Sequence, residues 1–70
     1  MQTIKAHITG TVWKIEVKPG DHVEAGATLV ILESMKMEMP VEADEAGEVV
    51  EVLVKEGQAV AEGAIVVTLK

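Results

Sequence analysis

The chain has 70 residues, no cysteine, and 12 acidic against six basic residues, which gives a formal net charge of −6. This length suits one small domain, and the lack of cysteine excludes disulfides and thiolate metal sites. The acidic balance argues against binding to nucleic acid or to anionic membrane surfaces, and no apolar run is long enough to span a bilayer. We therefore expect a cytoplasmic protein without a metal site, whose partners are other proteins or small groups.

The chain consists of two similar halves. A shift of 37 positions aligns residues 3–33 with residues 40–70 without a gap. Identical residues occur 37 positions after Ala6, Gly10, Val12, Val17, Lys18, Gly20, Val23, Gly26, Ala27, Val30 and Leu32. Such a repeat predicts two copies of one structural unit. We expect a single domain over residues 1–70, with residues 34–39 as the joint between its halves.

Each half is predicted to form four short strands. Val and Ile supply 17 of the 70 residues, and β-branched residues favour strands. Turn sequences divide the copies at matching places, with "KPGD" and "EAGA" in the first copy and "KEGQ" and "AEGA" in the second. Apolar residues alternate along one strand of each copy, at Trp13, Ile15, Val17, Val50, Val52 and Val54. From this pattern we expect Trp13 to be a core or partly buried packing residue.

The joint between the halves contains an unusual cluster, "ESMKMEM", at residues 33–39. Leu32, Met35 and Met39 have helical spacing, so this segment is ambiguous by itself. The matching end of the second copy, "AIVVTLK", is β-branched, and it favours a strand for "ATLVILE" as well. If "VILES" pairs antiparallel with "MEMPV", then Met35 and Lys36 form a two-residue loop. Lys36 is thus predicted to lie at the tip of a tight hairpin.

This predicted hairpin departs from two local rules. Two-residue hairpin loops need positive φ and prefer Asn or Gly, whereas Met35 and Lys36 meet a steric penalty there. The same register places Glu33 opposite Glu38, and facing like charges weaken a strand pair. Departures from local rules are frequent at functional sites. Physical reasoning alone leaves open the alternative of an ordinary solvated loop with an ordinary lysine.

The cluster resembles the attachment signature of the biotinyl domains of biotin-dependent carboxylases, in which methionines flank a biotin-bearing lysine. The flanking stretches, "GTVWKIEVKPGDHVEAGATLVILE" and "AGEVVEVLVKEGQAVAEGAIVVTL", are similar to the wider biotinyl/lipoyl attachment family. The resemblance covers nearly the whole chain. It implies an all-β fold, a flattened eight-stranded barrel-sandwich hybrid of two four-stranded antiparallel sheets with pseudo-twofold symmetry. The unbroken repeat resembles the compact, thumbless members of the family.

The resemblance also implies a function. Lys36 would be biotinylated by a biotin protein ligase, and the tethered biotin would shuttle a carboxyl group between biotin carboxylase and carboxyltransferase components. Met35 and Met37 would be recognised by the ligase, and the flanking hairpin residues would be Glu33, Ser34 and Glu38. The chain would then be a carrier without catalytic activity of its own, and a monomer in isolation.

Two alternatives share this fold. A lipoyl carrier would bear lipoate on Lys36, although lipoyl domains more often have Asp-Lys-Ala at the tip than Met-Lys-Met. Small free-standing proteins of this kind can accept both groups, so these two functions are compatible. The other alternative is an unmodified structural module, such as those in the adaptor proteins of efflux systems.

Overall fold

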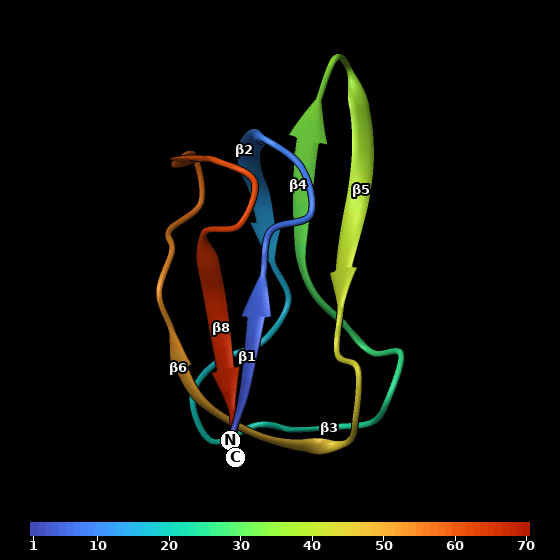
Figure 1. Ribbon diagram of the computed structural model, residues 1–70, viewed down its shortest axis with the longest axis vertical. Coiled ribbons are helices and arrows are strands. Elements are labelled where there is room, and N and C mark those ends of the chain that lie inside the picture. The colour runs from blue at the N-terminus through green and yellow to red at the C-terminus, as the bar shows by residue number, and fades with distance from the viewer.

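The computed structural model describes residues 1–70, which form eight β-strands (Figure 1). In chain order the strands are β1 (Gln2–Lys5), β2 (Gly10–Ile15), β3 (His22–Val23), β4 (Thr28–Ser34), β5 (Met37–Glu42), β6 (Gly47–Val52), β7 (Ala59–Val60) and β8 (Ile65–Leu69). Four strands come from each half of the sequence, as the repeat predicts. The fold has no helix that could cross a membrane.

The two halves interleave in two four-stranded sheets. One sheet has the strand order β1-β8-β6-β3 and the other has the order β5-β4-β2-β7. All neighbouring strands are antiparallel. Each sheet therefore takes two strands from each half, and the 37-residue shift converts one strand order into the other. The predicted fold class, two four-stranded antiparallel sheets related by a pseudo-twofold, is confirmed.

The core lies between the sheets and is entirely apolar. It contains fifteen buried residues, and no polar or charged side chain is buried. Every core residue except Val54 has its repeat equivalent in the same core, and the equivalent of Val54, Val17, packs against it. Because both halves contribute matching positions, the pseudo-symmetry of the backbone extends to the packed side chains.

Glycine turns at equivalent positions of the two copies each donate a backbone hydrogen bond to a strand of the other copy. Gly20 and Gly57 have φ angles of 95° and 88°, a region that side chains with a Cβ rarely adopt. The Gly20 N–H donates to the carbonyl of Val49 at 2.8 Å, and the Gly57 N–H donates to the carbonyl of Val12 at 2.7 Å. The turn sequences "KPGD" and "KEGQ" thus make equivalent backbone hydrogen bonds in the two copies.

Trp13 is not a core residue, and on this point the sequence-based expectation was wrong. The register between β2 and β4 shifts between Val12 and Lys14, so Trp13 is the extra residue of a β-bulge. The bulge interrupts the alternation on which the expectation rested. Val12 is 1% exposed, whereas Trp13 is 47% exposed. Val50, the repeat equivalent of Trp13, lies in the corresponding bulge of β6 and is also exposed.

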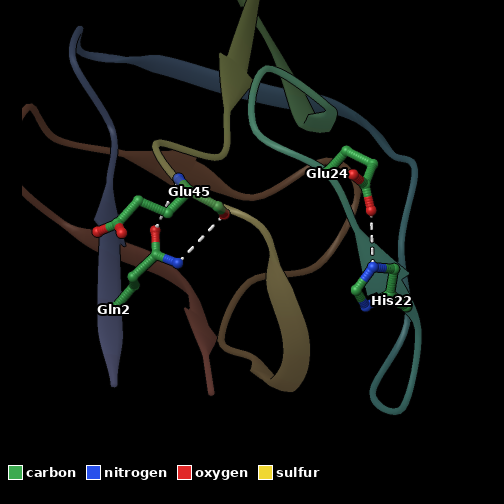
Figure 2. Close-up of polar contacts among 4 residues, drawn as sticks. All are labelled: Gln2, His22, Glu24 and Glu45. Carbon is green, nitrogen blue, oxygen red and sulfur yellow. Dashed lines mark hydrogen bonds and ion pairs between the residues drawn. The ribbon is translucent and has the colours of Figure 1, made fainter.

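The two chain ends lie together at one end of the molecule, opposite the β4–β5 hairpin (Figure 1). Near this end the side chain of Gln2 brackets the backbone of Glu45 (Figure 2). Its Nε2 donates to the Glu45 carbonyl at 3.2 Å, and its Oε1 accepts from the Glu45 N–H at 3.2 Å. These bonds tie β1 to the loop that precedes β6.

Candidate functional site: the β4–β5 hairpin

The β4–β5 hairpin has the predicted register. The two strands pair antiparallel and are joined by Met35 and Lys36 alone. The cross-strand pairs are Ser34↔Met37, Glu33↔Glu38, Leu32↔Met39, Ile31↔Pro40 and Val30↔Val41. The hairpin extends beyond the other strands (Figure 1). Lys36 therefore lies at the far tip of the molecule.

The turn at this tip has an unfavourable backbone conformation. The φ angles of Met35 and Lys36 are 52° and 65°, and no other non-glycine residue of the chain has a positive φ. Positive φ at both central residues is the signature of a type I′ hairpin turn. For a residue with a Cβ this region costs about 1–2 kcal/mol. The predicted two-residue loop is confirmed, and its strain is concentrated on Lys36 and its neighbour.

Lys36 and the methionines beside it are presented to solvent. Lys36 is exposed and takes part in neither of the ion pairs of the molecule. Met35 is 91% exposed and Met37 is 61% exposed. Met39, in contrast, is partly buried opposite the fully buried Leu32. The tip thus combines an unpaired amine with two large apolar side chains that the core does not use.

The charges of the hairpin are unbalanced. Glu33 and Glu38 face each other across the strands, and both are exposed and outside any ion pair. Lys36 is the only basic residue of the two strands and their turn. Facing like charges cost a few tenths of a kcal/mol in an exposed strand pair. The predicted juxtaposition of the two carboxylates is confirmed, and it leaves two acidic groups free beside the lysine.

Other parts of the molecule have fewer features of a functional site than the hairpin. One surface hollow is lined by Thr3, Ile4, Lys5, His7, Val41, Glu42 and Asp44, none of which belongs to the turn. No three His, Asp or Glu side chains lie close enough together to hold a metal ion. His22 contacts Glu24, with its Nε2 at 2.7 Å from a carboxylate oxygen, and both side chains are well exposed (Figure 2). The hairpin alone combines strain, a free amine and exposed apolar side chains.

Comparison with known proteins identifies the family. Residues 2–69 match the biotin/lipoyl family model, whose description is "Biotin-requiring enzyme". The chain belongs to the biotin/lipoyl attachment family. It is 48% identical over 67 residues to the biotin/lipoyl attachment protein of Bacillus subtilis, covering 96% of this chain and 92% of that protein. It is 38% identical over 68 residues to the biotinylated protein TB7.3 homolog of Mycobacterium leprae, covering 97% and 96% of the two chains.

A solved structure of this family has nearly the same fold. The urea carboxylase of Kluyveromyces lactis superimposes with a TM-score of 0.94 and 39% sequence identity. The match covers 99% of this chain but only 6% of the carboxylase. The chain thus corresponds to one small part of that enzyme.

The residues at the tip fit a covalently attached group of the kind this family bears. Biotin and lipoate both join a lysine amine through an amide, which requires an amine that is free of other partners and open to solvent. Lys36 meets both conditions. The roles predicted for Met35, Met37, Glu33, Ser34 and Glu38 stay predictions. Sequence reasoning expected Trp13, in the same sheet, to pack in or against the core, and its exposure was not foreseen because no signal in the sequence marks the bulge.

Proposed function

We propose that the chain is a biotin carboxyl carrier and that Lys36 is its attachment residue. The single observation that carries this proposal is an exposed, unpaired lysine at the tip of a strained two-residue turn. Two small relatives of similar length support it, because the name of one includes biotin attachment and the name of the other states that it is biotinylated. The match to part of a urea carboxylase supports a role in carboxylation, because that enzyme's name states a carboxylation.

Lys36 would act as the nucleophile in its own modification. A biotin protein ligase would supply biotin as an acyl-adenylate, and the Nζ of Lys36 would attack the acyl carbon. The new C–N amide bond forms as the bond to AMP breaks, and the amine loses its positive charge. Because a free lysine is mostly protonated at neutral pH, the attacking amine has to give up a proton, and we assign that base to the ligase. The chain contributes to this reaction by holding the amine of Lys36 at the exposed tip of the hairpin.

Biotin, when attached, supplies a ureido group that takes up a carboxyl group in one active site and releases it in another. The chain supplies a rigid stem that holds the arm away from the body of the domain. Tethering raises the local concentration of the group at both active sites. We accordingly propose a non-catalytic, monomeric, cytoplasmic carrier, whose partners are biotin carboxylase and carboxyltransferase components.

Lipoate is the second candidate group for Lys36. The relative from Bacillus subtilis has both biotin and lipoyl in its name. The exposed amine of Lys36 is suited to either acid, since both attachments are amides. The two modifications would compete for the same atom, so one chain would bear one group at a time.

Intact mass after co-expression with a biotin protein ligase tests the proposal. The parent chain is expected to gain the mass of one biotinyl group, and Lys36→Arg is expected to gain none. Lys18→Arg and Lys55→Arg serve as matched controls, because both lysines lie beside turns at equivalent positions of the repeat. They should be labelled like the parent. Strong labelling of Lys36→Arg would refute the assignment. A parent chain that bears a lipoyl mass instead would favour the lipoyl carrier, and one without any added mass would favour the structural module.

A further inference from the structure

The outer face of the sheet that contains the hairpin has a defined order of side chains. The register places Thr11, Glu33 and Glu38 in one row across β2, β4 and β5, nearest the turn. Leu32, the next residue of β4, is buried and points into the core. The following outward row contains Lys14, Ile31 and Pro40.

The bulge adds Trp13 to this second row. The β2–β4 register pairs Lys14 with Ile31 and leaves Trp13 as the extra residue before Lys14. The exposed fraction of Trp13 is 47%, and Val12 before it is buried, so the indole belongs to the outer face. Pro40 is exposed and Ile31 is partly exposed. Trp13, Ile31 and Pro40 therefore form an apolar patch, which we call the Trp13 patch, beyond the carboxylates of Glu33 and Glu38.

The pseudo-symmetry shows that the fold does not require the Trp13 patch. At the equivalent places of the other sheet, Val50 replaces Trp13, Thr68 replaces Ile31 and Thr3 replaces Pro40. The inner faces of the two sheets contribute matching residues to one core, so the two outer faces have no packing reason to differ in this way. At these three places the larger apolar side chains occur on the sheet that carries the hairpin, whereas on the other sheet Leu53 and Ile65 are exposed where this sheet has Glu16 and Thr28.

We propose that the Trp13 patch is the docking surface for the enzyme that acylates Lys36. The inference rests on the proposed function of Lys36. An enzyme that acts on the Nζ atom itself must bring its active site to the tip of the hairpin, and the outer face of this sheet is a surface directly beside that tip. The patch is continuous with the hairpin, because Ile31 and Pro40 are a cross-strand pair of the same two strands.

The carboxylates between the tip and the patch indicate the chemistry of the partner. Glu33 and Glu38 are exposed and have no cation of their own. A basic surface beside an apolar pocket would complement both features, with the pocket receiving the indole of Trp13. A partner that acts on the distal end of an attached group would stand several methylenes farther from this face. The acylating enzyme is therefore the occupant that fits.

Steady-state kinetics of Lys36 acylation by a purified biotin protein ligase test the docking surface. Trp13→Val introduces the residue that occupies the equivalent bulge, and Val50→Ala on the opposite sheet is the matched control. Removing one aromatic anchor is expected to raise the KM for the carrier roughly tenfold, with kcat within about twofold of the parent. Val50→Ala should leave both constants unchanged. An unchanged KM for Trp13→Val, or an equal rise for Val50→Ala, would overturn the proposal.

Two further measurements separate docking from folding and from the function of Lys36. Thermal unfolding identifies a variant that fails to fold, and Ile31→Thr, which introduces the residue at the equivalent place, then replaces Trp13→Val. A parent chain that is biotinylated at Lys36, with a KM that none of these variants changes, would refute the docking surface and leave the proposed function intact. A parent chain that is not modified would refute the proposed function.

Trp13 also offers a direct spectroscopic probe, because it is the only tryptophan of the chain. The carrier labelled with 5-fluorotryptophan has one fluorine, whose NMR signal reports on this position alone. Adding ligase without ATP or biotin is expected to shift or broaden the signal, and adding a biotin carboxylase component at the same concentration is not. A signal that ligase leaves unchanged, at concentrations that saturate modification, would overturn the proposal.

Discussion

The two ends of the molecule are built from equivalent strand pairs, and only one of them is extended. The terminal end pairs β1 with β8, and the attachment end pairs β5 with β4. The registers correspond, with Gln2↔Leu69 matching Met39↔Leu32 and Ile4↔Val67 matching Val41↔Val30. Past these pairs the terminal end stops at the chain ends, whereas the attachment end continues through two more pairs and a turn. The shared pairs contribute buried residues to the core, such as Leu32 and Leu69, and all candidate site residues lie in the extension.

This comparison predicts that the shared pairs determine stability equally at both ends. Leu32 and Leu69 are repeat equivalents, and both are 0% exposed. Leu32→Ala and Leu69→Ala are each expected to lower the free energy of unfolding by about 2–5 kcal/mol, because each leaves a cavity in the same core. Chemical denaturation measures both values. A loss confined to one of the two variants would show that the ends are not energetically equivalent.

The extension should behave in the opposite way. Met35→Leu and Met37→Leu conserve volume and apolarity at exposed positions, so the melting temperature is expected to stay within a few degrees of the parent value. Biotinylation by the ligase should slow, because these side chains are predicted to be recognised. Met39→Ala is the contrasting variant, since Met39 packs opposite Leu32 and its loss should destabilise the domain. Unfolding of Met35→Leu or Met37→Leu, with native modification of the remaining folded fraction, would contradict the account.

A smaller effect is expected from the strain of the turn. Met35 has a φ of 52°, which glycine adopts without a steric penalty. Met35→Gly should therefore raise the free energy of unfolding by up to about 1 kcal/mol, the relief of strain being partly offset by the entropy of the unfolded chain. Ser34→Gly is the control, because Ser34 has no positive φ to relieve and should only lose stability. If Met35→Gly is less stable than the parent, the turn is not strained in the way its backbone indicates.

The smallest expected change in stability comes from the facing carboxylates. Glu38→Lys replaces a repulsion with Glu33 by an attraction, which should preserve or raise stability by a fraction of a kcal/mol. Biotinylation should nevertheless slow, mainly through a higher KM, and the difference from the parent should shrink at high salt. Equal rates for the two chains at low salt would remove Glu38 from the recognition of the hairpin.

The repeat explains why so much of the hairpin was predictable from sequence. The second copy identified β4 as a strand where local spacing was ambiguous, and pairing the flanking strands then fixed Met35 and Lys36 as the turn. The arrangement in two sheets required the family resemblance. A repeat shows that two units are alike, but it does not say whether their strands pair within a unit or between units.

The position of Trp13 could not be predicted. A β-bulge depends on how two strands slide past each other, and no residue type in "TVWKIE" marks it. Simple alternation along this strand therefore placed the indole on the wrong face. The two hydrogen bonds between Gln2 and Glu45 could not be predicted from the sequence either, because they join residues that are 43 positions apart. The repeat gives no hint of them, since the equivalent of Gln2 is Met39, whose side chain cannot make such bonds.

We expect that the fold, by displaying the extended hairpin, makes Lys36 a substrate. The most direct test compares kcat/KM for ligase-catalysed biotinylation of the whole chain with that of a synthetic peptide of residues 28–42. An isolated hairpin is marginally stable at best in water, so the peptide has the same side chains without the fixed turn. We expect the whole chain to be modified at least about a hundredfold faster than the peptide. Equal values for chain and peptide would contradict it, because recognition would then lie in the local sequence and not in the structure that presents it.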